Sequence, residues 1–206
     1  MLKDLLSYKF RLRRARLLSE FLVSFEPPIN VLDVGGTADF WDKFSESIDK
    51  KINVTILNID LEDRQTSYRL VRGDARSLPF KDNMFDVIFS NSLIEHFGSF
   101  NDQQKVAREI RRVGKRYFIQ TPNRNFAIEP HFVFPFFQFL PLPIKIFLLQ
   151  KFNLGWVGRI KDKKLAEETV SSFRLLNFYD LKALFPDGEI INERLLGLTK
   201  SFIIFK

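Results

Sequence analysis

The sequence predicts an α/β fold, in which a mostly parallel β-sheet carries helices on its faces. Short apolar runs alternate along the chain with segments of helical periodicity, and that alternation is typical of parallel βαβ units. The first run, VLDV at Val31–Val34, breaks at once into Gly35 and Gly36, which indicates a buried strand followed by a tight turn. A chain of 206 residues that is 45% hydrophobic and 28% charged is long enough for a sizeable core. We therefore expect a single domain over residues 1–206.

The expected elements follow from the local patterns. Residues 1–28 should form an N-terminal helix segment, with an amphipathic helix over Leu5–Phe25 that Pro27 and Pro28 end. Strands are expected at Asn30–Val34, Asn53–Asn58, Tyr68–Arg72, Phe85–Ser90 and Arg116–Gln120. Helices are expected around Phe40–Phe44 and over Lys105–Arg112 and Ser171–Phe185. The last apolar runs, Glu189–Leu196 and Thr199–Phe205, predict an antiparallel hairpin that turns at Gly197 and Leu198.

Residues 123–165 break this alternation, because they are aromatic, contain prolines and have little periodicity. We expect an insertion on the acceptor side of the sheet, after strand five. The stretch over residues 132–152 has three readings: a lid with core packing, a surface that dips into a membrane to reach a lipid-linked acceptor, or a dimer surface. In the membrane reading, Lys145, Lys151 and the basic N-terminal helix would lie near anionic head groups.

Charge and composition limit the partners and the compartment. The net charge of +7 permits an anionic partner, but the basic residues are scattered and no separate RNA-binding module follows, so nucleic acid is the weaker expectation. The absence of cysteine excludes disulfides and fits a reducing compartment. No segment is apolar enough to span a bilayer, and the opening residues do not resemble a secretory signal. We expect a cytoplasmic protein, with peripheral membrane contact left open.

Acidic residues follow successive predicted strands. In open α/β sheets, ligands bind beyond the carboxyl ends of the strands. The residues expected at this edge are Asp33, Asp60, Asp74 and Glu95, with Asn91 and Ser92. One such acid alone is more often a cap or turn residue, but carboxylates at four strand ends repel phosphates and suit a cofactor with positive charge and free hydroxyls. A dinucleotide G-x-G-x-x-G is absent, which argues against NAD.

Several of these segments resemble class I S-adenosylmethionine-dependent methyltransferases of the small bacterial type. The resemblance rests on VLDVGG at 31–36, ILNIDL at 56–61, GDARSLPFKDNMFDVIFSNSLIEHF at 73–97 and YFIQTPNRNFAIEPHFVFPFFQFLP at 117–141. It implies a Rossmann-like three-layer sandwich, with a mostly parallel seven-stranded sheet and an antiparallel C-terminal hairpin. The turn departs from the family after Gly36, where Thr37, Ala38 and Asp39 replace the usual further glycines.

The resemblance also implies which residues bind S-adenosylmethionine. The turn would contribute four residues: Asp33, Gly35, Gly36 and Thr37. The first three would hold the amino-acid end of the cofactor, and Thr37 is the first residue at which the turn departs from the family. The ribose and adenine would be held by Asp60, Leu61, Asp74 and Ala75. Asn91 and Ser92 would line the floor near the sulfonium.

The two histidines, His96 and His131, are the candidate catalytic bases. Both follow predicted strand ends, and an imidazole titrates near neutral pH, so either could take a proton from an acceptor. Each also has a plain structural reading: His96 as a helix-start residue, and His131 as a hydrogen-bonded loop residue. Glu95 and Glu129 could orient the histidines or bind a metal, but the four residues lack metal-ligand spacing, and no metal is predicted.

The function predicted from these residues is methyl transfer from S-adenosylmethionine to a small-molecule acceptor, at an oxygen of a sugar, a lipid-linked intermediate or another metabolite. Two alternatives stay open. One is an RNA methyltransferase, although the SNSLIEHF loop lacks the Asn/Asp-Pro-Pro-aromatic motif of enzymes that methylate base amino groups. The other is a non-catalytic module of the same fold that binds a partner or a membrane.

Overall fold

A computed structural model describes residues 2–44, 48, 51–61 and 65–206. Its main sheet has seven strands in the order β3-β2-β1-β4-β5-β9-β8, and a second, two-stranded sheet pairs β6 with β7. The α/β class with a mostly parallel sheet is confirmed. The strands are β1 (Ile29–Val34), β2 (Ile52–Asn58), β3 (Arg69–Arg72), β4 (Phe85–Asn91), β5 (Gly114–Pro122), β6 (Ile128–Glu129), β7 (Phe134–Pro135), β8 (Glu189–Leu195) and β9 (Leu198–Phe205). The α-helices are α1 (Leu2–Leu22), α2 (Ala38–Phe44), α3 (Phe100–Val113), α4 (Leu142–Lys151), α5 (Lys163–Ser171) and α6 (Phe178–Leu184).

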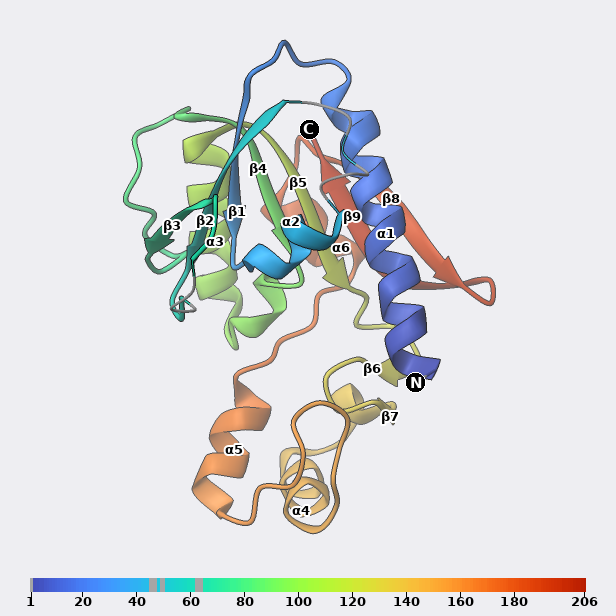
Figure 1. Cartoon of the computed structure of the whole chain (residues 1–206). Coiled ribbons are helices and arrows are strands. Elements are labelled where there is room, and N and C mark those ends of the chain that lie inside the picture. Colours follow the sequence, from blue (N-terminus) through green and yellow to red (C-terminus); the bar gives the residue numbers. More distant parts are fainter. Residues whose placement is uncertain (1, 45–47, 49–50, 62–64) are drawn as a thin grey trace. The chain divides into compact units, whose positions relative to one another are not determined.

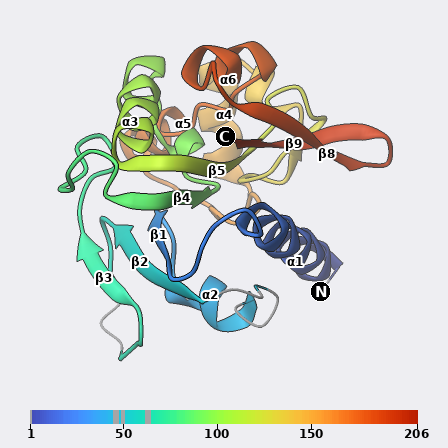
Figure 2. The same ribbon diagram turned by 90° about the horizontal axis from the view of Figure 1, so that it is seen from above.

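The chain divides into two compact units, one of residues 1–91 with 109–118 and one of residues 92–108 with 119–206. In the first unit, β1 pairs in parallel with β2 on one side and β4 on the other, and β2 pairs in parallel with β3. Asp33 lies opposite Ile56 of β2 and Phe89 of β4, so this acid is in the central strand. Figure 2 shows α1 and α2 on the same face of these strands.

Aromatic side chains fix the helices of the first unit on the strands. Phe89 of β4 lies with its ring centroid 5.1 Å from that of Phe40 and 5.5 Å from that of Trp41, both on α2. Phe21 of α1 contacts Phe118 of β5 with centroids 5.8 Å apart. As expected, α1 buries an apolar face that includes Leu18 and exposes Lys9, Arg13 and Arg16. The helix ends at Leu22, three residues earlier than predicted.

The second unit contains the antiparallel hairpin of β8 and β9 and the segment that follows β5. The predicted hairpin is confirmed, but its two-residue turn is Leu196–Gly197, one residue before the expected pair. Both turn residues have positive φ, which matches the twist of the paired strands. In Figure 1, α4 lies beside α5, with the short strands β6 and β7 nearby. Phe132, Phe137, Ile146 and Leu149 are buried in a common core with α5.

The prediction of one helix over Ser171–Phe185 is wrong for its first half. Helix α5 ends at Ser171, and α6 begins only at Phe178. Asn177 caps α6 by accepting hydrogen bonds from the backbone N–H groups of Tyr179 and Asp180, while the Asp180 carboxylate accepts from the backbone N–H of Asn177. This capping box starts a new helix and excludes one continuous helix. In the part of the chain that the structure describes, no helix is both long and apolar enough to cross a membrane.

Candidate functional site

The glycine turn after β1 is tied by hydrogen bonds to the end of β2, which is tied in turn to the loop after β3. Gly35 has φ of 77°, and its N–H donates to the Leu57 carbonyl at 2.7 Å. The Asn58 side-chain amide donates to the Gly36 carbonyl at 3.0 Å, and the Asn58 carbonyl accepts from the Gly73 N–H at 3.1 Å. Asn58 therefore joins three of the loops that carry predicted cofactor residues. The sequence reasoning missed it, although its place at the end of an apolar run is a readable signal.

Asp33 is a buried acid at the base of this turn. Its side-chain Oδ2 accepts a hydrogen bond from Trp41 Nε1 at 2.8 Å, whereas its Oδ1 is buried and has no partner among the described residues. Burial raises the pKa of Asp33 to about 7, and the hydrogen bond from Trp41 only partly offsets this effect. A Cβ on Gly36 would lie 1.8 Å from Asp33 Oδ2, so only glycine lets the turn pass so close to the carboxylate.

The loops after β2 and β3 present their predicted residues differently. Asp60 is exposed, and its backbone N–H donates to Asn58 Oδ1 at 3.4 Å, which leaves its carboxylate accessible to a diol. Asp74 instead forms an ion pair with Arg76, with its Oδ2 2.6 Å from Arg76 Nη2. A contact from Asp74 to an adenine amino group would therefore compete with Arg76. Ala75 is buried.

A buried arginine reaches the end of β4. Arg14 of α1 is 6% exposed, and its Nη1 donates to Asn91 Oδ1 at 2.9 Å. Nothing in the sequence distinguishes Arg14 from its neighbours in the basic helix, so the sequence reasoning missed this residue. Ser92, the next residue after Asn91, has φ of 60° and donates its hydroxyl to Gln120 Oε1 at 2.7 Å. A positive φ in a non-glycine residue is strained and is common at functional sites.

The second unit brings the two histidines together. Their ring centroids are 5.0 Å apart, and the Phe173 ring lies 4.2 Å from that of His131. Glu129 holds His131 in place, because Oε1 accepts from His131 Nδ1 at 2.7 Å and Oε2 accepts from the backbone N–H groups of His131 and Phe132. A carboxylate can only accept, so Nδ1 carries the proton and Nε2 of His131 is the ring nitrogen that can take one.

His96 differs from His131 in its surroundings. His96 is an exposed residue, yet its ring packs against the rings of His131 and Phe173, each at 5.0 Å between centroids. Burial of the ring and the charge of His131 lower the pKa of His96 to about 4, against a weaker opposing effect of Glu129. His96 is therefore neutral at physiological pH. One donor atom from each of Glu95, His96 and His131 lies within 4.8 Å of the others, a grouping that the sequence spacing did not show. Glu95 Oε2 also accepts from the Thr121 hydroxyl at 2.9 Å.

The exposed Asp60 gives a direct test of the cofactor assignment. We expect Asp60→Ala to weaken binding of S-adenosylmethionine by about 1–3 kcal/mol, because the ribose would lose a charged hydrogen-bond acceptor. Calorimetric titration of the folded variant measures this change. Asp42→Ala, an exposed acid of α2, is the matched control and should bind as the natural chain does. An unchanged affinity for the Asp60 variant would remove Asp60 from the site.

Comparisons with known proteins agree with the geometry. Residues 36–117 match the model of a methyltransferase domain family. A ubiquinone/menaquinone biosynthesis C-methyltransferase of Idiomarina loihiensis is 30% identical over 131 residues, which make up 56% of this chain and 51% of the relative. The chain thus spans about half the length of the curated relative that it matches.

Two solved structures have a similar fold. A protein from Pyrococcus horikoshii superposes with a TM-score of 0.57 at 17% identity, with 96% of this chain and 89% of that chain covered. A SAM-dependent methyltransferase from Aquifex aeolicus gives a TM-score of 0.51 at 15% identity, with 93% and 87% covered.

An open, mostly parallel sheet with a glycine turn after its central strand defines the class of α/β proteins that hold nucleotide-like cofactors beyond the strand ends. Within this class, residues 36–117 match the methyltransferase domain family, and the chain shares its fold with a solved SAM-dependent methyltransferase. The resemblance drawn from the sequence motifs is confirmed. The roles of the individual site residues stay predictions.

Proposed function

We propose that the protein transfers a methyl group from S-adenosylmethionine to a small-molecule acceptor. The observation that carries this proposal is the buried Asp33 carboxylate, which has a raised pKa and an oxygen without a partner among the described residues. A ligand with an ammonium group would supply the missing positive charge. Arg14, buried at the end of β4, would suit the carboxylate of the same zwitterionic ligand. A diphosphate would instead meet the buried acid and be repelled.

The residues present fit the remaining parts of such a cofactor. Asp60 is exposed for the ribose hydroxyls, and the partly exposed Leu61 offers apolar surface for the adenine, whereas Ala75 is buried. When bound, S-adenosylmethionine supplies an electrophilic methyl group, so that placing the acceptor in line does most of the work. The protein must then bind the acceptor, exclude water and remove a proton where the acceptor carries one.

His131 is the residue that we propose as the general base. Glu129 orients its ring and stabilises the imidazolium that forms when Nε2 takes the proton. His96, neutral because of its lowered pKa, contributes to the same catalytic cluster without adding a charge that would oppose protonation of His131. An acceptor hydroxyl needs a base of this kind, which supports an oxygen of a sugar, a lipid-linked intermediate or another metabolite.

A carbon acceptor is the second candidate. The curated relative is named as a C-methyltransferase of ubiquinone and menaquinone biosynthesis. Methylation of an activated carbon also needs a base, so the histidine cluster would serve either reaction.

An isotope experiment separates these possibilities. The protein is incubated with S-adenosylmethionine labelled with ¹³C in its methyl group and with separate fractions of soluble metabolites, lipids and RNA. The ¹³C chemical shift of the product then distinguishes a methyl group on oxygen from one on carbon. Label in an oxygen-bound methyl of a metabolite or lipid is the expected result. Label confined to RNA, or cofactor binding without transfer to any fraction, would contradict the proposal.

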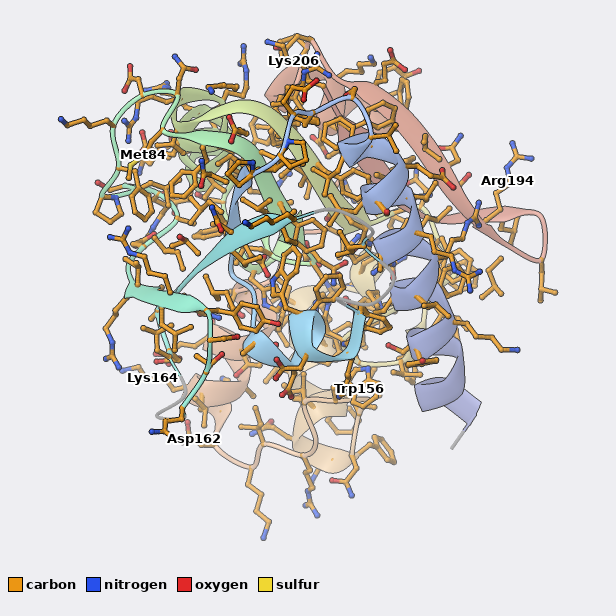
Figure 3. The ribbon with its side chains drawn as sticks, turned by 45° about the horizontal axis from the view of Figure 1, so that its top comes forward. Met84, Trp156, Asp162, Lys164, Arg194 and Lys206 are labelled. Carbon is orange, nitrogen blue, oxygen red and sulfur yellow. The ribbon has the colours of Figure 1, made fainter. Side chains whose placement is uncertain are left out.

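We also propose that residues 132–152 and the loop after them contact a membrane surface. Eight large apolar residues of this region are each at least 41% exposed: Val133, Phe136, Phe139, Leu142, Ile144, Phe147, Phe152 and Trp156. Trp156, labelled in Figure 3, is the most exposed of them. Helix α4 buries Ile146 and Leu149 in the core yet exposes Ile144 and Phe147, so it is apolar on two faces.

The charge of this segment also supports contact with a membrane. From Phe132 to Lys161 the sequence contains four basic residues and no acidic one. Aromatic side chains among isolated basic residues suit the interface of a bilayer with anionic head groups. A surface of this kind would bring the protein to a lipid-linked acceptor.

Vesicle binding tests this surface. We expect the protein to sediment with vesicles of phosphatidylcholine mixed with phosphatidylglycerol, and Phe147→Ser to weaken the partition by about 1.5 kcal/mol or more, because an aromatic ring no longer leaves water. Tyr179→Ser, which removes an aromatic ring that is 81% exposed on α6, is the control and should have no effect. An equal loss in both variants, or a dimer in light scattering without vesicle binding, would contradict the membrane proposal.

A further inference from the structure

A cavity of about 200 Å³ adjoins the histidine cluster within the second unit. Three basic side chains and three aromatic rings contribute to its wall: Arg124, Lys145, Arg174, Phe132, Phe137 and Phe173. Glu129 also lines the cavity, and the same carboxylate binds Nδ1 of His131. Phe173 in turn contacts the His131 ring. A ligand in this cavity would therefore be separated from the proposed base by no more than one side chain.

The charges around the cavity are poorly balanced. Arg174 is held by Asp180 and by Gln103 Oε1, at 3.1 Å and 2.7 Å. By contrast, neither Arg124 nor Lys145 forms an ion pair with a carboxylate in the described part of the chain. The Glu129 carboxylate already accepts three hydrogen bonds from the His131–Phe132 segment, so it does not neutralise them by direct contact.

The surroundings of Lys145 show the effect of this unbalanced positive charge. Burial lowers the pKa of Lys145, Glu129 acts in the opposite direction, and the nearby charge of Arg124 adds to the lowering. Lys145 donates a hydrogen bond to the Gln138 carbonyl at 3.1 Å, which fixes the ammonium group without neutralising it. An anion between Arg124 and Lys145 would relieve both their repulsion and the cost of burying the ammonium.

Gln138 adds a specific polar group to the wall. Its Nε2 donates to the carbonyls of Arg124 and Phe126 at 2.8 and 2.7 Å. Because carbonyls only accept, these two bonds fix the orientation of the side-chain amide, and the remaining atom is the oxygen Oε1. That Oε1 is buried and has no hydrogen-bond partner among the residues described. Buried acceptors are nearly always paired, so this oxygen calls for a hydroxyl or N–H donor.

We infer that this cavity binds the methyl acceptor, and that the acceptor is a hydroxylated anion such as a sugar phosphate. The phosphate or carboxylate would lie between Arg124 and Lys145, a hydroxyl would donate to Gln138 Oε1, and the apolar part would contact the phenylalanine rings. The naming of this ligand as the acceptor rests on the proposed function. The preference for a hydroxylated anion rests on the cavity alone.

Binding measurements on the full chain test the inference without requiring turnover. Glucose 1-phosphate, glucose and the soluble dihexanoyl phosphatidic acid are titrated calorimetrically into the natural chain and into Lys145→Met. Methionine keeps most of the apolar stem of the lysine and removes the charge. Lys163→Met, which removes one charge from an exposed position of α5 outside the proposed membrane surface, is the matched control.

We expect at least one phosphate to bind and glucose not to bind. Lys145→Met should weaken that binding about tenfold, the loss expected for one charge-assisted hydrogen bond, while Lys163→Met keeps it. Binding of glucose 1-phosphate alone assigns a free phosphate, and binding of the phosphatidic acid alone assigns a lipid-linked one. Glucose binding as tightly as its phosphate, no binding of either phosphate, or equal loss in both variants would overturn the inference. S-adenosylmethionine is titrated into the same samples, so that failure of the proposed function is seen separately.

Discussion

Asp33→Asn is expected to make the fold more stable at pH 8 and, at the same time, to weaken binding of S-adenosylmethionine. Burial raises the pKa of Asp33 from 3.8 to about 7 in the folded chain. An acid with a raised pKa contributes its full stability below pH 3.8 and loses that contribution as the pH rises through 7. The loss is on the order of 4 kcal/mol at pH 8, and asparagine, which does not ionise, removes up to that amount.

The gain in stability should come with a loss of cofactor affinity of about 1.5–3 kcal/mol, because the ammonium group would lose a charged partner. Urea unfolding of both proteins from pH 4 to pH 8 measures the first effect, and calorimetry measures the second. The difference in the free energy of unfolding should be small at pH 4 and should grow towards pH 8. Asp42→Asn, an exposed acid, should show neither effect. A difference that does not vary with pH would contradict the raised pKa of the buried Asp33 carboxylate.

His131→Ala is expected to lower turnover by about 10²–10⁴-fold and to leave the affinity for S-adenosylmethionine unchanged, since a general base contributes an effect of this size. Glu129→Gln should reduce kcat less and should leave KM unchanged, because the imidazolium loses its carboxylate partner while the ring keeps a hydrogen-bond acceptor. This split between kcat and KM identifies Glu129 as a positioning residue. Steady-state kinetics measures both variants, with the exposed Glu168→Gln as the control.

The grouping of Glu95, His96 and His131 requires one further arm of this experiment. If His131 is a base, dialysis against EDTA should leave the rate unchanged. A rate that falls with EDTA and returns with a divalent cation would reassign these three residues as metal ligands. A normal rate for His131→Ala would remove His131 from the chemistry altogether.

The main sheet was largely predictable because each of its strands has a local signal, whereas the short β6 and β7 were not predicted. The apolar runs that end in Asn58 and Ser90 predicted β2 and β4 to within one residue at each end. Helix α4 was not predicted, because its apolar residues cover two faces and hide the helical period. Helix α5 was also not predicted, and the helix expected from Ser171 begins only at Phe178, although the Asn177–Asp180 pair that forms its capping box can be read in the sequence.

The site was predictable in part. Asp33 and the two glycines stand in a turn whose residue types are distinctive, and the structure shows the burial and close packing that this turn requires. The roles of Arg14 and Lys145 come from contacts with residues distant in the sequence, and no local pattern reports such contacts. The pairing of His131 with Glu129 was only partly predictable. The two residues are close in the sequence, but their hydrogen bond depends on the conformation of the loop.

Calorimetric titration of the natural chain with S-adenosylmethionine and, separately, with NAD tests the central claim most directly. Asp60 suits the ribose of either molecule, whereas the buried acid at the glycine turn repels a diphosphate. We therefore predict saturable one-to-one binding of S-adenosylmethionine and no binding of NAD. Binding of NAD without binding of S-adenosylmethionine would contradict the claim that this turn holds a sulfonium zwitterion.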